Sequence, residues 1–181
     1  MASFSDKYIV ASGPINNWNF KRLHLDPDHP NAKGVVDYWL DPIPDIKAAV
    51  TKTFGSIGNW DVSGVTDMSR GFDSLRNLNA TTFNDNIDNW DVSNVVKFSF
   101  LFRGATSFNQ PLNSWNLINA NTVESMFYQC SLFDKPLNSW DVSEISNFNN
   151  MFKNCSNFNQ PLNSWEPKKA ITMEGMFSGC S

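Results

Sequence analysis

The chain has 181 residues, of which 41% are hydrophobic and 18% are charged, and it carries a formal net charge of −4 at pH 7. This size and composition suit one globular domain, and the acidic balance excludes the basic surface that nucleic-acid-binding proteins present. No apolar run is long enough to span a membrane, and the first residues lack the basic and apolar stretches of a secretory signal.

Residues 1–53 are predicted to form an N-terminal cap that contains a degenerate strand and one helix. The phrase GPINNWNF at 13–20 matches GSIGNWDV at the start of the repeated region, and this match predicts the strand. Further on, the apolar residues of DIKAAVTKT at 45–53 share one helical face. We expect Asp45 in the first turn of that helix and Gly55 just after its end. The helix should cover the first repeat.

Tryptophan recurs at a nearly fixed interval through the rest of the chain. The five tryptophans are Trp60, Trp90, Trp115, Trp140 and Trp165. The last three intervals are equal, the first is longer, and the neighbouring letters repeat with the tryptophans. FNQPLNSW leads into the tryptophan, DVS follows it, and a Met-Phe pair and a cysteine come later. A fixed period of about 20–50 residues indicates an array of stacked units. The extra residues of the first interval fall in or beside RNLNATT, where we expect a bulging loop.

Each unit is predicted to contain one short strand and one short helix. Trp90 and Val92 would point to one side of an extended segment, with Asp91 on the other. The apolar residues that follow are spaced as on a helix, and the slot that holds glycine or asparagine after them is expected to be its left-handed end. We therefore predict an α/β fold in which residues 54–181 form a right-handed, leucine-rich-repeat-like solenoid of short parallel strands and short helices, with about five 25-residue repeats behind the N-terminal cap. The helical residues of one unit would be Val95, Phe98, Leu101, Phe102 and Ala105, with Gly104 as the left-handed end.

The repeated phrase FNQPLNSWDVS, followed by the Met-Phe pair and the cysteine, resembles the BspA-like leucine-rich-repeat family, which is abundant among mycoplasma surface lipoproteins. The resemblance covers most of the chain and includes FGSIGNWDVSGVTDMS at 54–69. It implies a surface or interaction protein without catalytic activity, and it says almost nothing about which ligand is bound.

The three cysteines are predicted to be small buried hydrophobic residues. Cys130, Cys155 and Cys180 occupy one slot of the repeat, and Ala105 fills the same slot in an earlier unit. No C-x-x-C pair is present, which argues against a zinc ribbon.

Two columns of asparagine are expected to bind backbone groups at a corner of the repeat. A ligand-binding role for them is the weaker interpretation. The columns comprise Asn84, Asn109 and Asn159, and Asn113, Asn138 and Asn163.

Polar residues beside the tryptophans form the candidate interaction face, because they would point away from the core. A cation is one alternative ligand, but each repeat offers a single carboxylate and an asparagine interrupts the column, whereas calcium takes about six to eight oxygens. A solvated or protein-binding face is therefore favoured. The residues of this face are Asp61, Ser63, Asp91, Ser93, Asn116, Asp141, Ser143 and Glu166.

The loop HLDPDHP holds both histidines of the chain and is a further candidate for binding a metal. Because nothing elsewhere supplies a matched partner, a polar, proline-stiffened loop is favoured, and we predict no metal and no cofactor. No Ser/His/Asp set, glycine-rich phosphate loop or H-E-x-x-H motif is present, so we expect no enzyme. The loop residues concerned are His24, Asp26, Asp28 and His29.

The C-terminal contact end is the second candidate interaction surface. The last half-repeat leaves apolar residues without a following layer, so we expect it to be covered by further residues of the same polypeptide, by a protein partner or by a neighbouring subunit. The residues of this end are Ile171, Met173, Met176 and Phe177.

These features predict a non-catalytic structural or protein–protein interaction solenoid, used as an assembly or surface-adhesion module, of which a virus-particle component would be one example. The alternative is a carbohydrate- or cation-binding surface domain. We expect protein partners, no nucleic acid and no membrane insertion. An intracellular or virus-particle location is favoured over secretion, because the thiols are free and no signal sequence is seen.

Overall fold

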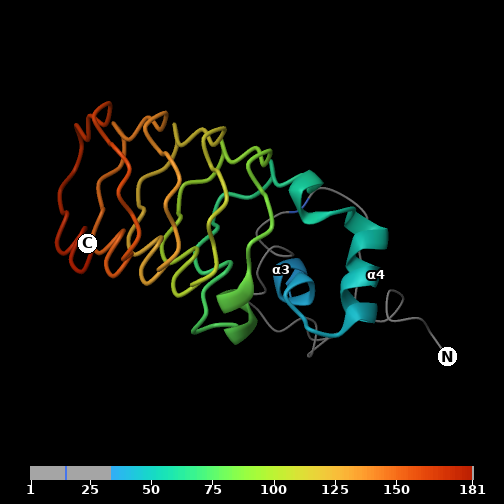
Figure 1. The fold of residues 1–181 in the computed structure, drawn as a ribbon. Helices are drawn as coiled ribbons and strands as arrows, with labels where there is room; N and C mark the ends of the chain where they lie inside the picture. The colour runs from blue at the N-terminus through green and yellow to red at the C-terminus, as the bar shows by residue number, and fades with distance from the viewer. Residues whose placement is uncertain (1–14, 16–33, 181) are drawn as a thin grey trace.

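The computed structural model describes residue 15 and residues 34–180, and this part of the chain forms a short helical region followed by a stack of coils (Figure 1). Helix α3 spans Val35–Trp39 and helix α4 spans Pro44–Phe54. Two short 3₁₀ helices follow, η1 at Ile57–Asn59 and η2 at Leu78–Thr82. Apart from Ile15, the strand predicted at 13–20 lies outside the described residues, and so does the whole HLDPDHP loop.

The helix predicted at 45–53 is confirmed as α4, which is one residue longer at each end. Asp45 lies in its first turn, and Pro44 takes a position where a missing N–H does no harm. Gly55 follows the helix with a φ of 76°, a left-handed conformation that glycine adopts without strain. Trp39 of α3 packs edge-on against Trp60 of the first coil, with ring centroids 5.5 Å apart.

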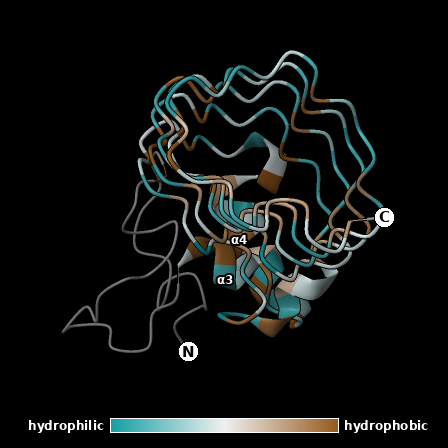
Figure 2. Cartoon of the chain, turned by 90° about the vertical axis from the view of Figure 1, so that its left-hand side faces the viewer, coloured by the Kyte–Doolittle hydropathy of each residue, from teal (hydrophilic) through white to brown (hydrophobic). Residues whose placement is uncertain are grey.

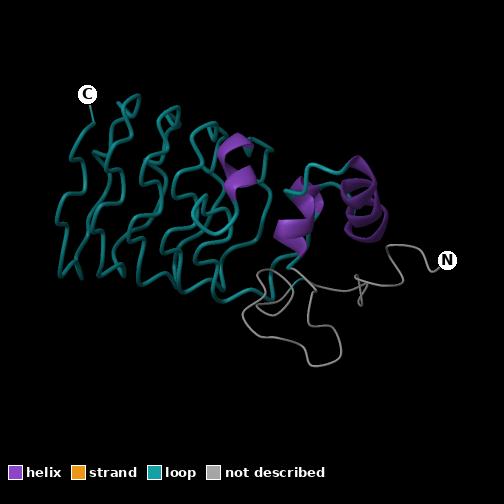
Figure 3. Cartoon of the chain, turned by 90° about the horizontal axis from the view of Figure 1, so that it is seen from below, coloured by secondary structure: helices purple, strands orange, loops and turns teal. Residues whose placement is uncertain are grey.

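The predicted leucine-rich-repeat-like solenoid of short parallel strands and short helices is wrong. Among the described residues no strand is formed, and the only helices after residue 54 are the two 3₁₀ helices (Figure 3). Parallel pairing is limited to isolated bridges between neighbouring coils, and these bridges lie well after each tryptophan rather than at the tryptophan itself. The bridged residues are Asp67, Lys97, Thr122, Asn147 and Thr172.

Hydrogen bonding explains why residues 98–105 form turns instead of the predicted helix. Backbone N–H groups alternate between two kinds of acceptor, whereas a helix directs all of them four residues back along the same segment. The intervening groups close turns three residues back, as the N–H of Leu101 does to the carbonyl of Phe98 at 3.1 Å. The other groups reach the next coil: Phe98 bonds to Thr122 (3.1 Å), Phe100 to Glu124 (2.8 Å), Phe102 to Met126 (2.9 Å) and Gly104 to Tyr128 (2.7 Å).

Each coil after the first also contains two left-handed residues, which no α-helix admits. In one coil they are Phe100, with a φ of 62°, and Gly104, with a φ of 68°. The left-handed conformation predicted for Gly104 is therefore confirmed, although the residue belongs to a series of turns and ends no helix. Gln129, Asn154 and Gly179 take the same conformation in the later coils.

The core consists of aromatic ladders that run along the stack, because the coils superimpose when viewed from its end (Figure 2). Trp90 and Trp115 stack with ring centroids 6.5 Å apart and planes inclined by only 6°. Phenylalanines one coil apart stack in the same way, as Phe102 and Phe127 do at 5.6 Å. The predicted burial of Trp90, Trp115 and Trp140 is confirmed, since each is at most 3% exposed. Their indole faces are therefore unavailable to a sugar.

The extra residues of the first interval lie where the sequence placed them. They form η2, Leu78–Thr82, so the predicted loop contains a short 3₁₀ helix. Ala80 of this helix is buried, while Leu75 and Leu78 are exposed at the surface. The insertion thus lies beside α3, at the end of the stack that precedes the regular coils (Figure 1).

Candidate interaction surfaces

The buried polar atoms of the repeat are bound from one coil to the next. The indole N–H of Trp115 donates to the carbonyl of Ile87 at 3.1 Å, and that of Trp140 donates to Leu112 at 2.9 Å. The thiol of Cys130 donates in the same way to the carbonyl of Phe102 at 2.9 Å. The tryptophans and cysteines therefore link neighbouring coils as well as filling space.

The predicted burial of the cysteines is confirmed for Cys130 and Cys155, and Cys180 is partly exposed. Burial raises the pKa of the Cys155 thiol to about 12 and raises the pKa of Cys130 as well. The thiolate, which is the reactive form, is therefore suppressed at neutral pH.

The acidic column beside the tryptophans points outward but binds its own backbone. Asp61 accepts hydrogen bonds from both the N–H (3.1 Å) and the hydroxyl (2.6 Å) of Ser63. These bonds, the one from the hydroxyl foremost, lower the pKa of Asp61. The same contacts recur between Asp91 and Ser93. In the next coil the side chain of Asn116 accepts from the N–H two residues on, at 3.1 Å. Asp61, Asp91 and Asn116 thus each stabilise a local turn.

Three of the six predicted asparagines, Asn84, Asn109 and Asn138, bond through their side chains to the backbone of the next coil, as expected. The side-chain oxygen of Asn84 accepts from the N–H of Asn109 at 2.9 Å, and Asn109 accepts from the N–H of Asp134 at 3.0 Å. In the second column Asn138 accepts from the N–H of Ser164 at 3.0 Å. These side chains replace the hydrogen bonds that a regular sheet would supply.

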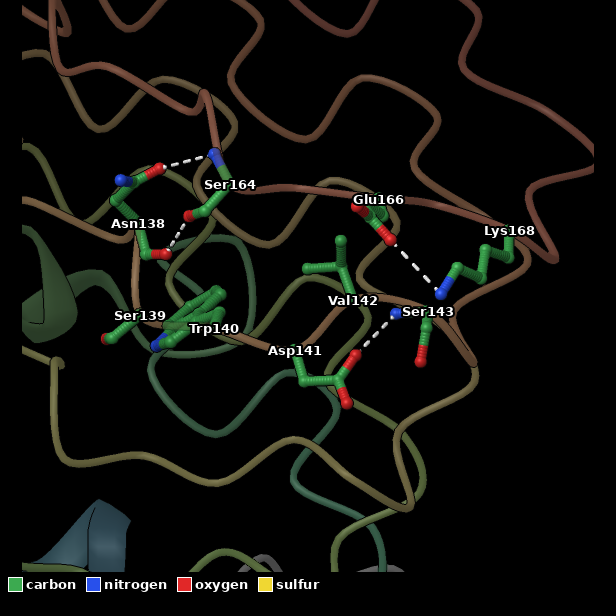
Figure 4. A pocket seen from close by; sticks show the side chains of 9 residues that line it. All are labelled: Asn138, Ser139, Trp140, Asp141, Val142, Ser143, Ser164, Glu166 and Lys168. Carbon is green, nitrogen blue, oxygen red and sulfur yellow. Dashed lines mark hydrogen bonds and ion pairs between the residues drawn. The ribbon is translucent and has the colours of Figure 1, made fainter.

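A polar depression of about 350 Å³ lies between the last two coils (Figure 4). It brings together three predicted face residues from neighbouring repeats, Asp141, Ser143 and Glu166, and adds Lys168. Glu166 pairs with Lys168 at 3.1 Å, and Asp141 accepts from the N–H of Ser143 at 2.9 Å. The charged groups of this depression therefore already have partners within the chain.

The N-terminal end of the stack is closed by a polar cluster that the sequence reasoning missed. Arg76 donates to the carboxylate of Asp37 in α3 and to the carbonyl of Gly71 in the first coil. Asn77 also donates to Asp37, at 3.0 Å. The N–H groups of Arg76 and Asn77 both bond to the carbonyl of Asp73, at 3.0 and 2.9 Å. We call these residues, Asp37, Arg76 and Asn77, the closing cluster.

A buried ion pair in the same region was also missed. The carboxylate of Asp73 is fully buried and accepts from Arg103 at 2.9 Å and from Arg70 at 3.2 Å. Asp73 and Arg103 occupy the same slot of neighbouring repeats, and so do the paired Glu144 and Lys169. Opposite charges in one slot of adjacent repeats are therefore the sequence signal that could have identified both pairs.

The C-terminal end of the stack exposes large apolar side chains. Ile171 is 86% exposed, Phe177 48% and Met173 42%, whereas Met176, the fourth residue predicted for this end, is buried. The equivalents of Met173 and Phe177 in the preceding coil, Phe148 and Phe152, are fully buried. Coverage by a following coil accounts for the difference.

The backbone of the same end is also incompletely bonded. In the preceding coil four alternate N–H groups donate to the last coil: Phe148 to Thr172 (3.0 Å), Asn150 to Glu174 (2.8 Å), Phe152 to Met176 (2.9 Å) and Asn154 to Ser178 (2.8 Å). The equivalent N–H groups of the last coil have no acceptor among the described residues. They form what we call the donor row: Met173, Gly175, Phe177 and Gly179. The donor row and the three exposed apolar side chains together make up the C-terminal end face.

Two further searches concern metals and membranes. Within residues 34–180 no group of three or more His, Cys, Asp and Glu side chains is placed to hold a metal ion. Among the helices of this same range, none combines the length and the apolar character that crossing a bilayer requires.

Comparison with protein families matches the chain to a family described as "Mycoplasma protein of unknown function, DUF285". The match covers residues 45–154 and, in a second copy, residues 122–181. No curated protein and no solved structure matches the chain.

Proposed function

Because this chain belongs to the DUF285 family of mycoplasma proteins of unknown function, we propose its role from the structure itself: a non-catalytic protein–protein interaction module that binds a protein through its C-terminal end face. The assignment to BspA-like repeat proteins in particular is part of the same proposal. It is supported by the phrase FNQPLNSW, which stands complete at 108–115 and 158–165.

The observation that carries the proposal is the contrast between the last coil and the coils before it. Side chains that are fully buried elsewhere in the stack are about half exposed at this end. Ile171 adds to the contrast, because the same slot holds polar residues, Asn121 and Ser146, in the two preceding coils. Exposed apolar groups beside unpaired backbone donors are typical of surfaces that further polypeptide covers.

The outward face supports the proposal less well. Its aspartates accept hydrogen bonds from their own turns, and the tryptophans that might have stacked on sugars are buried. We therefore keep the C-terminal end face as the single candidate binding surface.

Matched substitutions at the two ends of the stack test this proposal. Ile171→Asp places a charge on the end face, where Ile171 is 86% exposed, and Leu78→Asp places a charge on the insertion, where Leu78 is 75% exposed. Both residues are so exposed that the melting temperature should change little. Proteins retained from an extract of the source cells would be identified by mass spectrometry, purified and titrated against each variant.

We expect Ile171→Asp to weaken binding of the purified partner at least tenfold, which corresponds to about 1.4 kcal/mol, with no change for Leu78→Asp. Equal binding to both variants would contradict the proposal, and so would a partner that only the Leu78 variant fails to bind.

A further inference from the structure

We propose that one column of side chains specifies the order in which the coils stack, by making the first coil pair with the second in preference to any later one. The inference goes beyond the proposed function, because it concerns how this chain folds and not what it binds. The column lies thirteen residues after each tryptophan, and we call it the order column: Asp73, Arg103, Tyr128, Lys153 and Ser178.

The similarity of the repeats creates the need for such a column. The slot just before the order column holds phenylalanine in every repeat, and these rings stack at one spacing: Phe72 and Phe102 lie 5.5 Å apart, as do Phe127 and Phe152. Such shared core contacts do not distinguish one coil from another. Misassembly between similar units is a characteristic failure of repeat proteins, so the order has to be specified elsewhere.

The first junction of the order column is a buried ion pair. The carboxylate of Asp73 is 0% exposed and accepts from both the Nε and a terminal nitrogen of Arg103, whose side chain is only 15% exposed. Within the first coil, Arg70 and the backbone N–H of Leu75 donate to the same carboxylate, at 3.2 and 3.0 Å. A buried charge that loses one of its partners is strongly destabilising, so this carboxylate favours a neighbour that supplies the guanidinium.

Docking of the first coil onto a later coil would break this pair. Tyr128 of the third coil and Ser178 of the last carry no positive charge. Lys153 of the fourth coil is a point charge and cannot form the two parallel bonds of a guanidinium. Looping out the intervening residues costs little chain entropy, so a skipped coil can form during folding, and the loss of the ion pair would disfavour it.

Cation–π contacts add to the specificity of the same junction. The guanidiniums of Arg70 and Arg103 lie over the ring of Phe100, with their central carbons 4.8 and 4.7 Å from its centroid. Arg70 belongs to the first coil and Phe100 to the second, and the slot of Phe100 holds no aromatic residue in the later coils. Only the second coil therefore offers the first both a guanidinium and a ring.

A later junction of the order column has a different chemistry. The ammonium group of Lys153 lies 6.0 Å from the centroid of the Tyr128 ring in the preceding coil. Acid, base, aromatic ring, base and hydroxyl follow one another in the column, so neighbouring coils are matched while the slot just before it stays identical.

The test removes the ion pair from the full-length chain without leaving an unpaired charge. Asp73→Leu combined with Arg103→Met replaces the pair by apolar side chains, an exchange that is often neutral or stabilising at buried sites. The matched control is Glu144→Leu combined with Lys169→Met, which alters an exposed pair outside the order column. Each protein is refolded from urea by dilution, and hydrogen exchange of residues 84–108 is followed by mass spectrometry directly after refolding.

A molecule in which the first coil has docked out of order leaves residues 84–108 looped out, and its exchange gives a second, unprotected population. We expect a single protected population in the unsubstituted chain and in the control. In the Asp73→Leu/Arg103→Met variant the unprotected fraction should rise roughly tenfold, while the urea midpoint of the correctly folded molecules stays close to that of the unsubstituted chain. A single protected population in this variant would overturn the inference.

Two further variants separate the order of the coils from their stability. Arg103→Lys keeps the charge, and with it the fold, but gives the second coil the same column residue as the fourth; it should also raise the unprotected fraction. Val95→Ala shortens a buried side chain of the second coil outside the order column, and it should lower the urea midpoint without creating the second population. Refolding of Arg103→Lys that matches the unsubstituted chain, or an equal second population in Val95→Ala, would contradict the inference.

Discussion

At the residue scale, the repeated tryptophans form hydrogen bonds as well as filling the hydrophobic core. Trp115 is buried between the rings of Trp90 and Phe98, and its indole N–H reaches the carbonyl of Ile87. A buried N–H without a partner would cost free energy, so the carbonyl one coil back fixes the ring's position as well as its depth. This requirement explains why tryptophan occupies this position in every repeat: its side chain fills the core, and its indole N–H is a hydrogen-bond donor.

Trp115→Ala is expected to lower the free energy of unfolding by about 3–5 kcal/mol, because it removes a large buried side chain between two neighbouring coils. Trp165→Ala should cost less, since Trp165 lies in the last described coil and is only partly buried. Urea denaturation of both variants measures the difference. Similar losses for the two would show that the ladders do not extend as described.

The cysteine slot gives a prediction about pH. The pKa of Cys155 is raised from 9.0 to about 12 by burial, so the folded state keeps the thiol proton after the unfolded state has lost it. The contribution to stability is therefore constant below pH 9 and falls as the pH rises from about 9 to about 12. In Cys155→Ala, which copies Ala105, the free energy of unfolding should fall less steeply, by up to about 1.4 kcal/mol per pH unit. Urea titrations in a reducing agent at pH 8 to 11 measure this slope, and parallel curves for the two proteins would refute the assignment.

At the element scale, the repeat period, the buried positions and helix α4 could be predicted from sequence, but the local conformation of the repeat could not. Phe98, Phe102 and Ala105 are buried as predicted, because side chains pointing inward from consecutive turns recur at nearly helical spacing. The observed turns differ from a helix in the acceptors of their backbone N–H groups and in the positive φ at Phe100. Phenylalanine gives no sign of a left-handed residue, since glycine and asparagine are the usual ones.

Of the candidate surfaces, the exposed side chains could be predicted from sequence, but the polar contacts at the ends of the stack could not. The exposure of Ile171, Met173 and Phe177 follows from counting repeats, because the last coil has no neighbour in the printed sequence. The closing cluster could not be foreseen, since it joins Arg76 to Asp37, which belongs to no repeat and lies 39 positions earlier in the chain. The donor row likewise depends on backbone geometry, and side-chain patterns do not encode it.

A substitution at a left-handed position tests the conformation assigned to the turns. Gln129 has a φ of 61°, in the slot that Gly104 and Gly179 fill elsewhere. Gln129→Gly should raise the free energy of unfolding by about 0.5–1 kcal/mol. The left-handed conformation costs a residue with a side chain about 1–2 kcal/mol, which glycine avoids, but glycine loses more backbone entropy on folding and this offsets part of the gain. Asn154→Gly is the matched control and should gain less, because asparagine tolerates this conformation at its φ of 60°. A loss of stability in Gln129→Gly would argue against the turn.

At the scale of the whole molecule, the stack has one closed and one open end, and the closed end depends on charge. The side chains of Arg76 and Asp37 are only 23% and 14% exposed, so their attraction is weakly screened. The pair Lys169–Glu144 lies on the surface, with exposures of 62% and 47%. In double-mutant cycles to alanine we expect a coupling of about 1.5–3 kcal/mol for the first pair and below about 1 kcal/mol for the second. Equal couplings would mean that the cluster does not close the stack.

Stability should also vary along the stack, because each coil is supported by its neighbours and the last has one neighbour among the described residues. Hydrogen exchange can resolve this coil residue by residue. The amides of Met176, Ser178 and Cys180 bond within the coil, at 3.2, 3.0 and 3.1 Å, whereas those of Met173, Gly175, Phe177 and Gly179 form the unbonded donor row. We therefore expect slow and fast exchange to alternate along residues 175–180, while the equivalent amides of residues 148–155 are all protected. Uniform exchange across the last coil would show either that it unfolds as a unit or that another surface already covers the donor row. Light scattering on the same sample separates these two cases, because a covered row in the isolated chain requires association.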